Sequence, residues 1–400
     1  MSTTSDAAAA NERIPLSVPV LTGREGHYIQ ECLDTNWVSS GGPFVDRFER
    51  EFAQYVGTKH AIATVNGTAA LHTALVACNI QPDDEVLVSS LTFIATANAV
   101  RYANARPVFI DAEPTYWQMD PELVERFLTK DCVAWNGKLV NRRTGRRVSA
   151  ILSVHVLGHP ADLAPLLELA RRFDLALIED AAESLGATYD GQRVGRFGAF
   201  GCFSFNGNKT ITTGGGGMLT TNDDRLAALA KYLTTQAKDD PDDYIHRRVG
   251  FNYRMPNILA AFGCAQLEQL DRYIATKRAI AARYQTLTAA TPGLTLQPES
   301  PTCSHTYWLS TVEIDAVEYG RSMRAVRADL RRANIESRPL WQPIHLSPAH
   351  QGAQSVLSGV AERLYERCLS LPSSTNLTAA AQQRVLQSLA AGEQSIARAA

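Results

Sequence analysis

The sequence has 400 residues, of which 45% are hydrophobic and 20% are charged. This length predicts two or three domains, and the composition is typical of an ordinary globular protein and excludes collagen, coiled coils and small disulfide scaffolds. The 39 Lys and Arg residues nearly balance the 41 Asp and Glu residues, so the net charge of −2 favours neither a nucleic-acid partner nor an acidic membrane surface.

The leading segment and the apolar runs predict no export signal and no bilayer crossing. Residues 1–12 lack a basic start and a long apolar core, so we expect a disordered N-terminus there. No apolar stretch reaches the roughly 18 to 20 residues that a membrane-spanning helix needs. The seven cysteines are scattered without a CxxC pair, which indicates buried thiols rather than disulfides or a metal site. We therefore expect a cytoplasmic protein.

Short apolar runs alternate with helical patterns between about residues 58 and 222. Such runs are typical of strands buried on both faces of a sheet, and in chain order they cover residues 60–65, 85–90, 106–111, 149–156 and 175–180. The pattern predicts an α/β domain with a mostly parallel sheet and right-handed crossovers. Two further runs, 200–206 and 216–222, are too close for a helix between them, so we expect a mixed sheet at this end.

A polar insertion at residues 131–150 carries the turn signals Asn136-Gly137 and Thr144-Gly145. These signals predict a surface hairpin. Its basic cluster, NRRTGRR, is interpreted as solvated surface, and an anion-binding patch is the alternative.

Helical spacing continues for about thirty residues after Pro256, which indicates a connecting helix at 256–290. Two extended segments (305–314 and 335–340) and two helical ones (320–333 and 356–368) then outline a smaller α/β domain. We therefore predict a large domain at 13–255, the connecting helix, and a small C-terminal domain at 291–400.

Three segments of the predicted large domain carry candidate chemistry. Asn66-Gly67-Thr68-Ala69-Ala70 follows a strand and opens a helix, where free backbone N–H groups and a hydroxyl can form an anion cradle. An ordinary strand-to-helix turn is the alternative. Asp180 ends a parallel strand, where α/β sheets bind ligands, and a helix N-cap is its alternative role.

Lys209 is the third candidate, and it stands at the mouth of a strand, before four glycines at 214–217. A desolvated lysine can form a Schiff base with a carbonyl, and Ser204 could bind the same phosphate as Thr68. A phosphate cup, a carboxylate for a ring nitrogen and a lysine for an aldehyde are together what pyridoxal phosphate requires.

With these residues in this order, the sequence resembles the DegT family of sugar-nucleotide aminotransferases, which belongs to the fold type I pyridoxal phosphate enzymes. The resemblance extends from WVSSGGPFVDRFEREFAQYVG at 37–57 to LSLP at 369–372. The resemblance implies a large domain with a mixed, mostly parallel sheet between helices and a smaller α/β domain. It implies that Lys209 binds the cofactor and moves protons, and that Asp180 pairs with the pyridine nitrogen. Thr68, Ala69 and Ser204 are implied as phosphate ligands.

The resemblance also suggests roles for three further residues. Phe93 matches an aromatic residue that stacks on the cofactor ring. Glu183 stands where the family often has Gln or His near the phenolic oxygen of the ring. Asn252, in GFNYRM, matches an Asn that reaches the cofactor phosphate of the neighbouring subunit, which implies a homodimer with shared active sites.

The implied reaction moves an amino group from glutamate to the keto carbon of a nucleotide-linked sugar, with pyridoxamine phosphate as the intermediate form of the cofactor and 2-oxoglutarate as the released product. Four segments resemble the branch of the family that acts on UDP-2-acetamido-4-keto-6-deoxy sugars, for surface glycans of the legionaminic acid or bacillosamine type. These segments are PLSVPVLTGREGHYIQECLDTNWVSS, NGKLVNRRTGRR, VHVLGHP and SRPLWQPIHLSP. A GDP-linked 4-keto sugar, as in perosamine synthesis, and a 3-keto sugar are alternatives within the family.

Two rival readings use the same scaffold for other purposes. A dehydratase would carry histidine in place of Lys209, and a regulatory binding protein would be expected to lose Lys209 or Asp180. This sequence keeps both residues.

Overall fold

The computed structural model describes residues 12–240 and 242–396. The predicted disordered N-terminus falls almost entirely on residues 1–11 and lies outside the described part. In the described part no helix is long and apolar enough to cross a membrane. All seven cysteines are free thiols.

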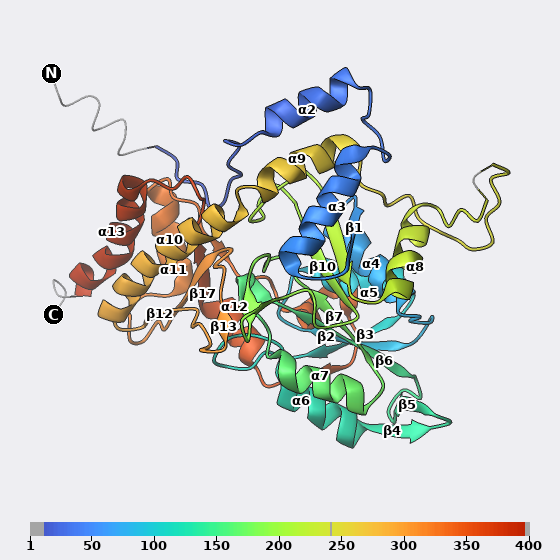
Figure 1. The fold of residues 1–400 in the computed structure, drawn as a ribbon. Coiled ribbons are helices and arrows are strands. Elements are labelled where there is room, and N and C mark those ends of the chain that lie inside the picture. The colour runs from blue at the N-terminus through green and yellow to red at the C-terminus, as the bar shows by residue number, and fades with distance from the viewer. Residues whose placement is uncertain (1–11, 241, 397–400) are drawn as a thin grey trace.

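An eight-stranded sheet is the centre of the fold (Figure 1). Its strands, in spatial order, are β1 (His60–Thr64), β11 (Gly217–Thr221), β10 (Phe200–Ser204), β7 (Ala176–Asp180), β6 (Val148–Val154), β2 (Glu85–Ser89), β3 (Arg106–Ile110) and β16 (Ser355–Val356). Strands β10 through β16 run parallel, and β11 is antiparallel to both β1 and β10. The expected mixed end of the sheet is confirmed.

Helices cover both faces of this sheet. Because successive strand residues point to opposite faces, alternate side chains enter two separate cores. One core contains α4 (Gly67–Ala77), α5 (Ile94–Tyr102) and α8 (Asp224–Thr234). The other contains α2 (Glu25–Asp34), α3 (Pro43–Val56), α6 (Pro121–Arg126), α7 (Leu163–Arg172) and α9 (Asn257–Leu267). This three-layer α/β arrangement is the one that the strand pattern predicted.

The insertion at 131–150 forms the expected hairpin. Strands β4 (Cys132–Trp135) and β5 (Lys138–Asn141) pair antiparallel after a short π-helical turn (Phe127–Asp131). Asn136 and Gly137 both have positive φ, at 48° and 72°, as the turn signal requires. Figure 1 shows the hairpin projecting at the bottom of the view.

A second, antiparallel sheet lies in the C-terminal part. Its order is β12 (Leu294–Leu296), β14 (Ser310–Ile314), β17 (Cys368–Leu371) and β15 (Arg338–Pro339). Helices α10 (Leu270–Ala290), α11 (Met323–Arg332) and α13 (Ala379–Ile396) share a hydrophobic core with it. Helix α12 (Val360–Arg367) and the short strands β8 (Thr188–Tyr189), β9 (Gln192–Arg193) and β13 (Cys303–Ser304) complete the described elements, with 3-10 turns at 156–158, 344–346 and 348–350.

The expectation of one continuous connecting helix was wrong. The chain forms α9 and α10 with a break at Glu268 and Gln269. Helix α9 packs against α2 and α3, and the Glu268 carboxylate accepts hydrogen bonds from Tyr28 and Arg47. Beyond the break, α10 continues toward the C-terminal sheet (Figure 1). The domain boundaries stay a prediction, and β16 adds one segment of the predicted small domain to the edge of the large sheet.

Candidate active site

A cavity of about 710 Å³ lies at the carboxyl ends of β6, β7 and β10. Its lining comes from the large sheet and from the segment around β15, so both parts of the chain enclose it. Six of the eight residues expected from the sequence line it: Thr68, Phe93, Asp180, Glu183, Ser204 and Lys209. Ala69 and Asn252 do not.

Asp180 is the last residue of β7, and its side chain is 4% exposed. Its Oδ2 accepts a hydrogen bond from Thr96 Oγ1 at 2.7 Å, and its Oδ1 accepts one from the backbone N–H of Ala182 at 3.2 Å. Burial raises the pKa of this carboxyl, and the two hydrogen bonds and the charge of Lys209 oppose the rise. Within the described chain, no basic side chain lies within ion-pair distance of Asp180. A cationic group in the cavity would supply the missing partner.

Lys209 extends into the same cavity from the loop after β10. Its Nζ lies 3.5 Å from Glu183 Oε1 and 4.2 Å from the centre of the Trp308 ring. The loop is held in place because the backbone O of Asn208 accepts a hydrogen bond from Trp308 Nε1 at 2.7 Å. The amine is therefore held between a carboxylate and an aromatic face, which restricts its direction.

Glu183 is buried, and it also positions the neighbouring loop. Its Oε2 accepts the backbone N–H of Leu157 at 2.8 Å, where the chain turns through a positive φ of 63°. Burial raises the pKa of Glu183, and the nearby Lys209 charge lowers it. The expected contact with the phenolic oxygen of a cofactor ring stays a prediction.

The start of α4 and the end of β10 meet at the cavity, where the sequence predicts an anion cradle. Thr68 and Ser204 both line the cavity. A Cβ at Gly67 would come within 2.8 Å of the Ser204 Cβ, so glycine is needed for this approach of helix to strand. The backbone N–H of Ala69 donates to the N-cap Asn66 side chain at 2.8 Å, so it is used within the helix end.

The remaining two candidates lie on exposed surface. Phe93 immediately precedes α5, and its side chain is 54% exposed at the cavity wall, where a flat ring could stack on it. Asn252 is exposed and accepts a hydrogen bond from Gln236 Nε2 at 3.1 Å. Its position outside the cavity of its own chain is compatible with a role in a partner's site, and that role stays a prediction.

Sequence reasoning missed two kinds of cavity residue. Thr96 and Trp308 orient Asp180 and Lys209, but they are 84 and 99 residues away from these partners along the chain. Arg327, Arg338 and Trp341 enter the cavity from the C-terminal part. Arg338 and Trp341 lie in SRPLWQPIHLSP, but nothing in the spacing of this segment predicts that they line the same cavity as Lys209.

The residues present fit pyridoxal phosphate. The buried carboxylate of Asp180 lacks a cation, the close approach of Gly67 to Ser204 leaves room for a phosphate, and the Lys209 amine in the same cavity would bind an aldehyde. Fold and site together define a fold type I pyridoxal phosphate transaminase.

A scan of family models agrees. The DegT/DnrJ/EryC1/StrS aminotransferase family matches residues 19–390, and the chain belongs to this family. Members use pyridoxal phosphate, so the chain is a pyridoxal phosphate-dependent sugar aminotransferase.

Curated relatives and solved structures extend over nearly the whole chain. GDP-perosamine synthase of Caulobacter vibrioides is 42% identical and covers 94% of this chain and 97% of its own length. GDP-perosamine synthase of Escherichia coli O157:H7 is 39% identical, with coverage of 91% and 94%. The crystal structure of S. venezuelae DesV in complex with a ketimine intermediate is 32% identical, with a TM-score of 0.84 and coverage of 94% and 97%.

Proposed function

We propose that this enzyme transfers an amino group from glutamate to the keto carbon of a GDP-linked 4-keto-6-deoxy sugar. The observation that supports this substrate is the similarity, over more than nine tenths of the chain, to two proteins named GDP-perosamine synthase. The UDP-linked 2-acetamido sugar expected from the sequence is the alternative, and no relative described above is named for it. A UDP-linked substrate therefore becomes the second arm of the test.

Asp180 and Lys209 would have different roles in the reaction. Bound pyridoxal phosphate would supply an electron sink for the carbanion left after a proton is removed. Asp180 would hold the proton on the ring nitrogen, since its buried carboxylate is fixed by Thr96 and Ala182. Lys209 Nζ would bind the aldehyde carbon and carry the proton between the two reacting carbons.

Charged residues from the C-terminal part would bind the anionic end of the substrate. Arg327 and Arg338 line the same cavity as Lys209, and guanidinium groups bind carboxylate and phosphate oxygens in pairs. Trp341 lines the same wall, and its ring stacks near-parallel on that of Trp308, 6.4 Å between centres. These residues would orient the nucleotide diphosphate or the glutamate carboxylate relative to Lys209.

The experiment is a substrate panel. The pyridoxamine form of the enzyme is incubated with GDP-, UDP- and dTDP-linked 4-keto and 3-keto sugars, and the product is identified by mass spectrometry and NMR. We expect amination of the GDP-linked 4-keto sugar. Exclusive amination of the UDP-linked 2-acetamido sugar would overturn the GDP assignment and leave the transaminase class intact.

A Lys209→Ala variant tests the assignment of the lysine independently of the sugar. The wild-type holoenzyme should show the visible absorbance band of lysine-bound cofactor, and the variant should lose both this band and turnover. An Arg338→Gln variant should keep the band and raise the KM for the sugar or for glutamate. A fully active Lys209→Ala enzyme would refute the proposed role of Lys209.

We also propose that the enzyme is a homodimer in which Asn252 of each subunit completes the site of the other. This proposal rests on the GFNYRM segment and on the exposed position of Asn252 outside its own cavity.

A further inference from the structure

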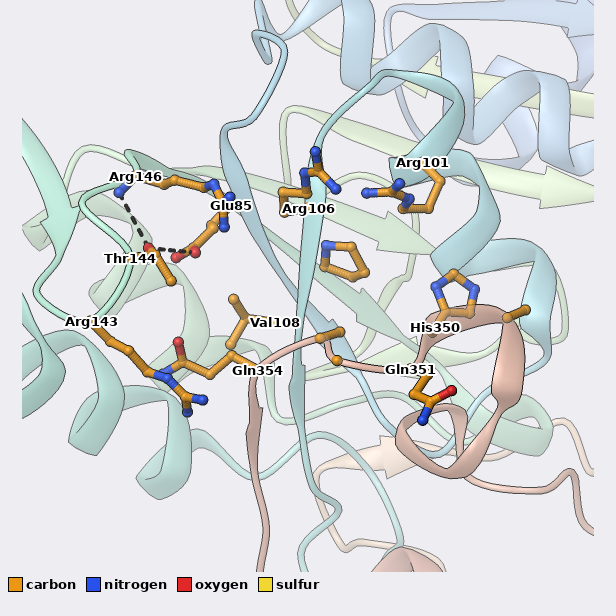
Figure 2. Close-up of a pocket in the computed structure, with 14 residues that line it drawn as sticks. Glu85, Arg101, Arg106, Val108, Arg143, Thr144, Arg146, His350, Gln351 and Gln354 are labelled. Atoms are coloured by element: carbon orange, nitrogen blue, oxygen red, sulfur yellow. Dashed lines mark hydrogen bonds between the residues drawn. The ribbon is translucent and has the colours of Figure 1, made fainter.

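A second pocket, of about 360 Å³, lies at the other end of the strands of the large sheet (Figure 2). It is formed by the end of α5, the starts of β2 and β3, the turn between β5 and β6, and the segment 349–354 before β16. These are the amino ends of the parallel strands, whereas the active-site cavity lies at their carboxyl ends. The two cavities share no lining residue.

Four arginines surround this pocket: Arg101, Arg106, Arg143 and Arg146. Figure 2 shows Arg143 and Arg146 on one side and Arg101 on the other. Arg106 pairs with Asp83 at 2.9 Å. In residues 12–240 and 242–396, no carboxylate lies within ion-pair distance of the other three guanidinium groups. The pocket therefore carries an excess of positive charge.

The carboxylate of Glu85 lines the pocket and accepts hydrogen bonds from β5 and from the turn between β5 and β6. Glu85 is 2% exposed, and its Oε1 accepts Thr144 Oγ1 at 2.7 Å while its Oε2 accepts Asn141 Nδ2 at 2.6 Å. Asn141 Nδ2 also donates to Gln354 Oε1 at 2.9 Å, which joins this turn to the segment 349–354. One buried and two part-buried hydrogen bonds therefore hold the turn that carries Arg143 and Arg146, as a preformed site requires.

From this arrangement we infer that the pocket binds a phosphorylated small molecule carrying at least two negative charges. Guanidinium groups bind phosphate oxygens in pairs, and arginines on several elements need a ligand with several such oxygens. The volume is within the range of small-molecule sites, and Pro107 and Val108 give the pocket an apolar floor. A net charge of −2 on the whole chain argues against a nucleic-acid or membrane surface.

The basic cluster of the insertion thus has a function beyond solvation. The sequence alone does not connect this cluster with Arg101 or the segment 349–354, because they are distant in the chain. The structure places two arginines of the cluster, Arg143 and Arg146, around one concavity with Arg101 and this segment. The ligand site is separate from the reaction proposed above and does not depend on the identity of the sugar.

Calorimetric titration of the holoenzyme with inorganic pyrophosphate tests this inference. The double variant R143Q/R146Q removes two guanidinium groups from exposed positions, and Arg101→Gln removes one from a different element. The matched control R324Q/R331Q removes the same charge from exposed positions of α11, outside both pockets. Circular dichroism establishes that each variant is folded.

We expect wild type and the control to bind pyrophosphate equally, R143Q/R146Q to bind at least tenfold more weakly, and Arg101→Gln to bind several-fold more weakly. The affinity of wild type should fall more steeply with salt than that of R143Q/R146Q. Equal affinity in wild type and R143Q/R146Q would overturn the inference. A wild-type protein that ignores pyrophosphate but binds phosphatidylglycerol vesicles would also overturn it.

Discussion

Two neighbouring carboxylates on β7 have different roles, because successive residues of a strand point to opposite faces of the sheet. Glu179 is fully buried, where it accepts hydrogen bonds from His155 and from the backbone N–H groups of Gly195, Phe197 and Gly198. Burial alone would raise its pKa, but these hydrogen bonds lower it, so Glu179 stays ionised as a structural anchor. Asp180, one residue later, faces the cavity and has no such set of donors.

The first prediction concerns the charge of Asp180. An Asp180→Asn variant keeps the size of the side chain but cannot hold the ring proton as an ionised carboxylate can. We expect turnover to fall at least about a hundredfold, which corresponds to about 2.7 kcal/mol of activation free energy. Steady-state kinetics with saturating cofactor provide the measurement. The exposed Asp174→Asn is the matched control, and an unimpaired Asp180→Asn enzyme would reduce Asp180 to a capping residue.

A second prediction concerns Lys277, a buried residue of α10 that contacts the segment carrying Trp308. Its Nζ donates to the backbone O atoms of Trp308 at 3.0 Å and Ser373 at 2.8 Å, and burial lowers its pKa to about 7. The unfolded chain, with an ordinary lysine pKa near 10.5, binds more protons than the folded one between these values. The contribution of Lys277 to stability should therefore increase from pH 7 to pH 10.

Urea unfolding of wild type and of Lys277→Met measures this contribution as a difference. Methionine has a similar length but leaves two buried carbonyls without a donor, which costs about 1–3 kcal/mol for each group. The difference in unfolding free energy should widen as the pH rises from 7 to 10, since other titrating groups cancel. A constant difference over this range would contradict a lowered pKa of Lys277.

At the scale of elements, α3 begins without a cap from its own segment. Its N-cap residue is Gly42, and the orphan N–H groups of Phe44 and Val45 instead donate to Asn257 Oδ1 at 2.9 and 3.2 Å. The Asn257 Nδ2 donates in turn to the backbone O of Trp37 at 2.8 Å. One side chain at the start of α9 therefore ties two helices together over more than 200 residues of sequence.

The third prediction is that Asn257→Ala destabilises the protein by about 1–3 kcal/mol, because buried donors lose their acceptor. Urea unfolding measures the loss. Asn376→Ala, at an exposed position, is the control and should change the unfolding free energy by less than about 0.5 kcal/mol. Equal effects of the two substitutions would show that Asn257 is not a cap.

Elements governed by local rules could be predicted from the sequence. Strands buried on both faces appear as short apolar runs, and Asn136-Gly137 requires a hairpin turn. The break between α9 and α10 could not be predicted, because helical spacing continues through it and the contacts of Glu268 come from α2 and α3. The capping of α3 by Asn257 could not be predicted either, because the two partners are more than 200 residues apart in the sequence.

The candidate site was partly predictable for a related reason. Residues that end strands or open helices, such as Asp180 and Thr68, carry a positional signal in the sequence. Thr96 and Trp308 carry no such signal, since their roles arise from packing against distant elements. The second pocket combines arginines from three elements, and only the folded sheet brings them together.

At the scale of the whole molecule, a shared active site predicts that activity requires a dimer, because no single chain carries every residue of one site. If Asn252 serves the partner's cofactor phosphate, then Lys209→Ala and Asn252→Ala chains are defective in different sites of a dimer. A heterodimer of the two would hold one site with both lesions and one intact site. Each homodimer would hold two defective sites.

Co-expression of the two variants with different tags tests this arrangement without relying on subunit exchange. Random pairing gives about half heterodimers, each with one intact site in two, so activity should recover toward about a quarter of wild type. Heterodimers purified through both tags should reach about half of the wild-type activity per dimer. If both residues served the site of their own chain, every site would carry one lesion, and purified heterodimers would be no more active than the homodimers. That result would refute the role of Asn252 in trans while leaving the assignments of Lys209 and Asp180 untouched.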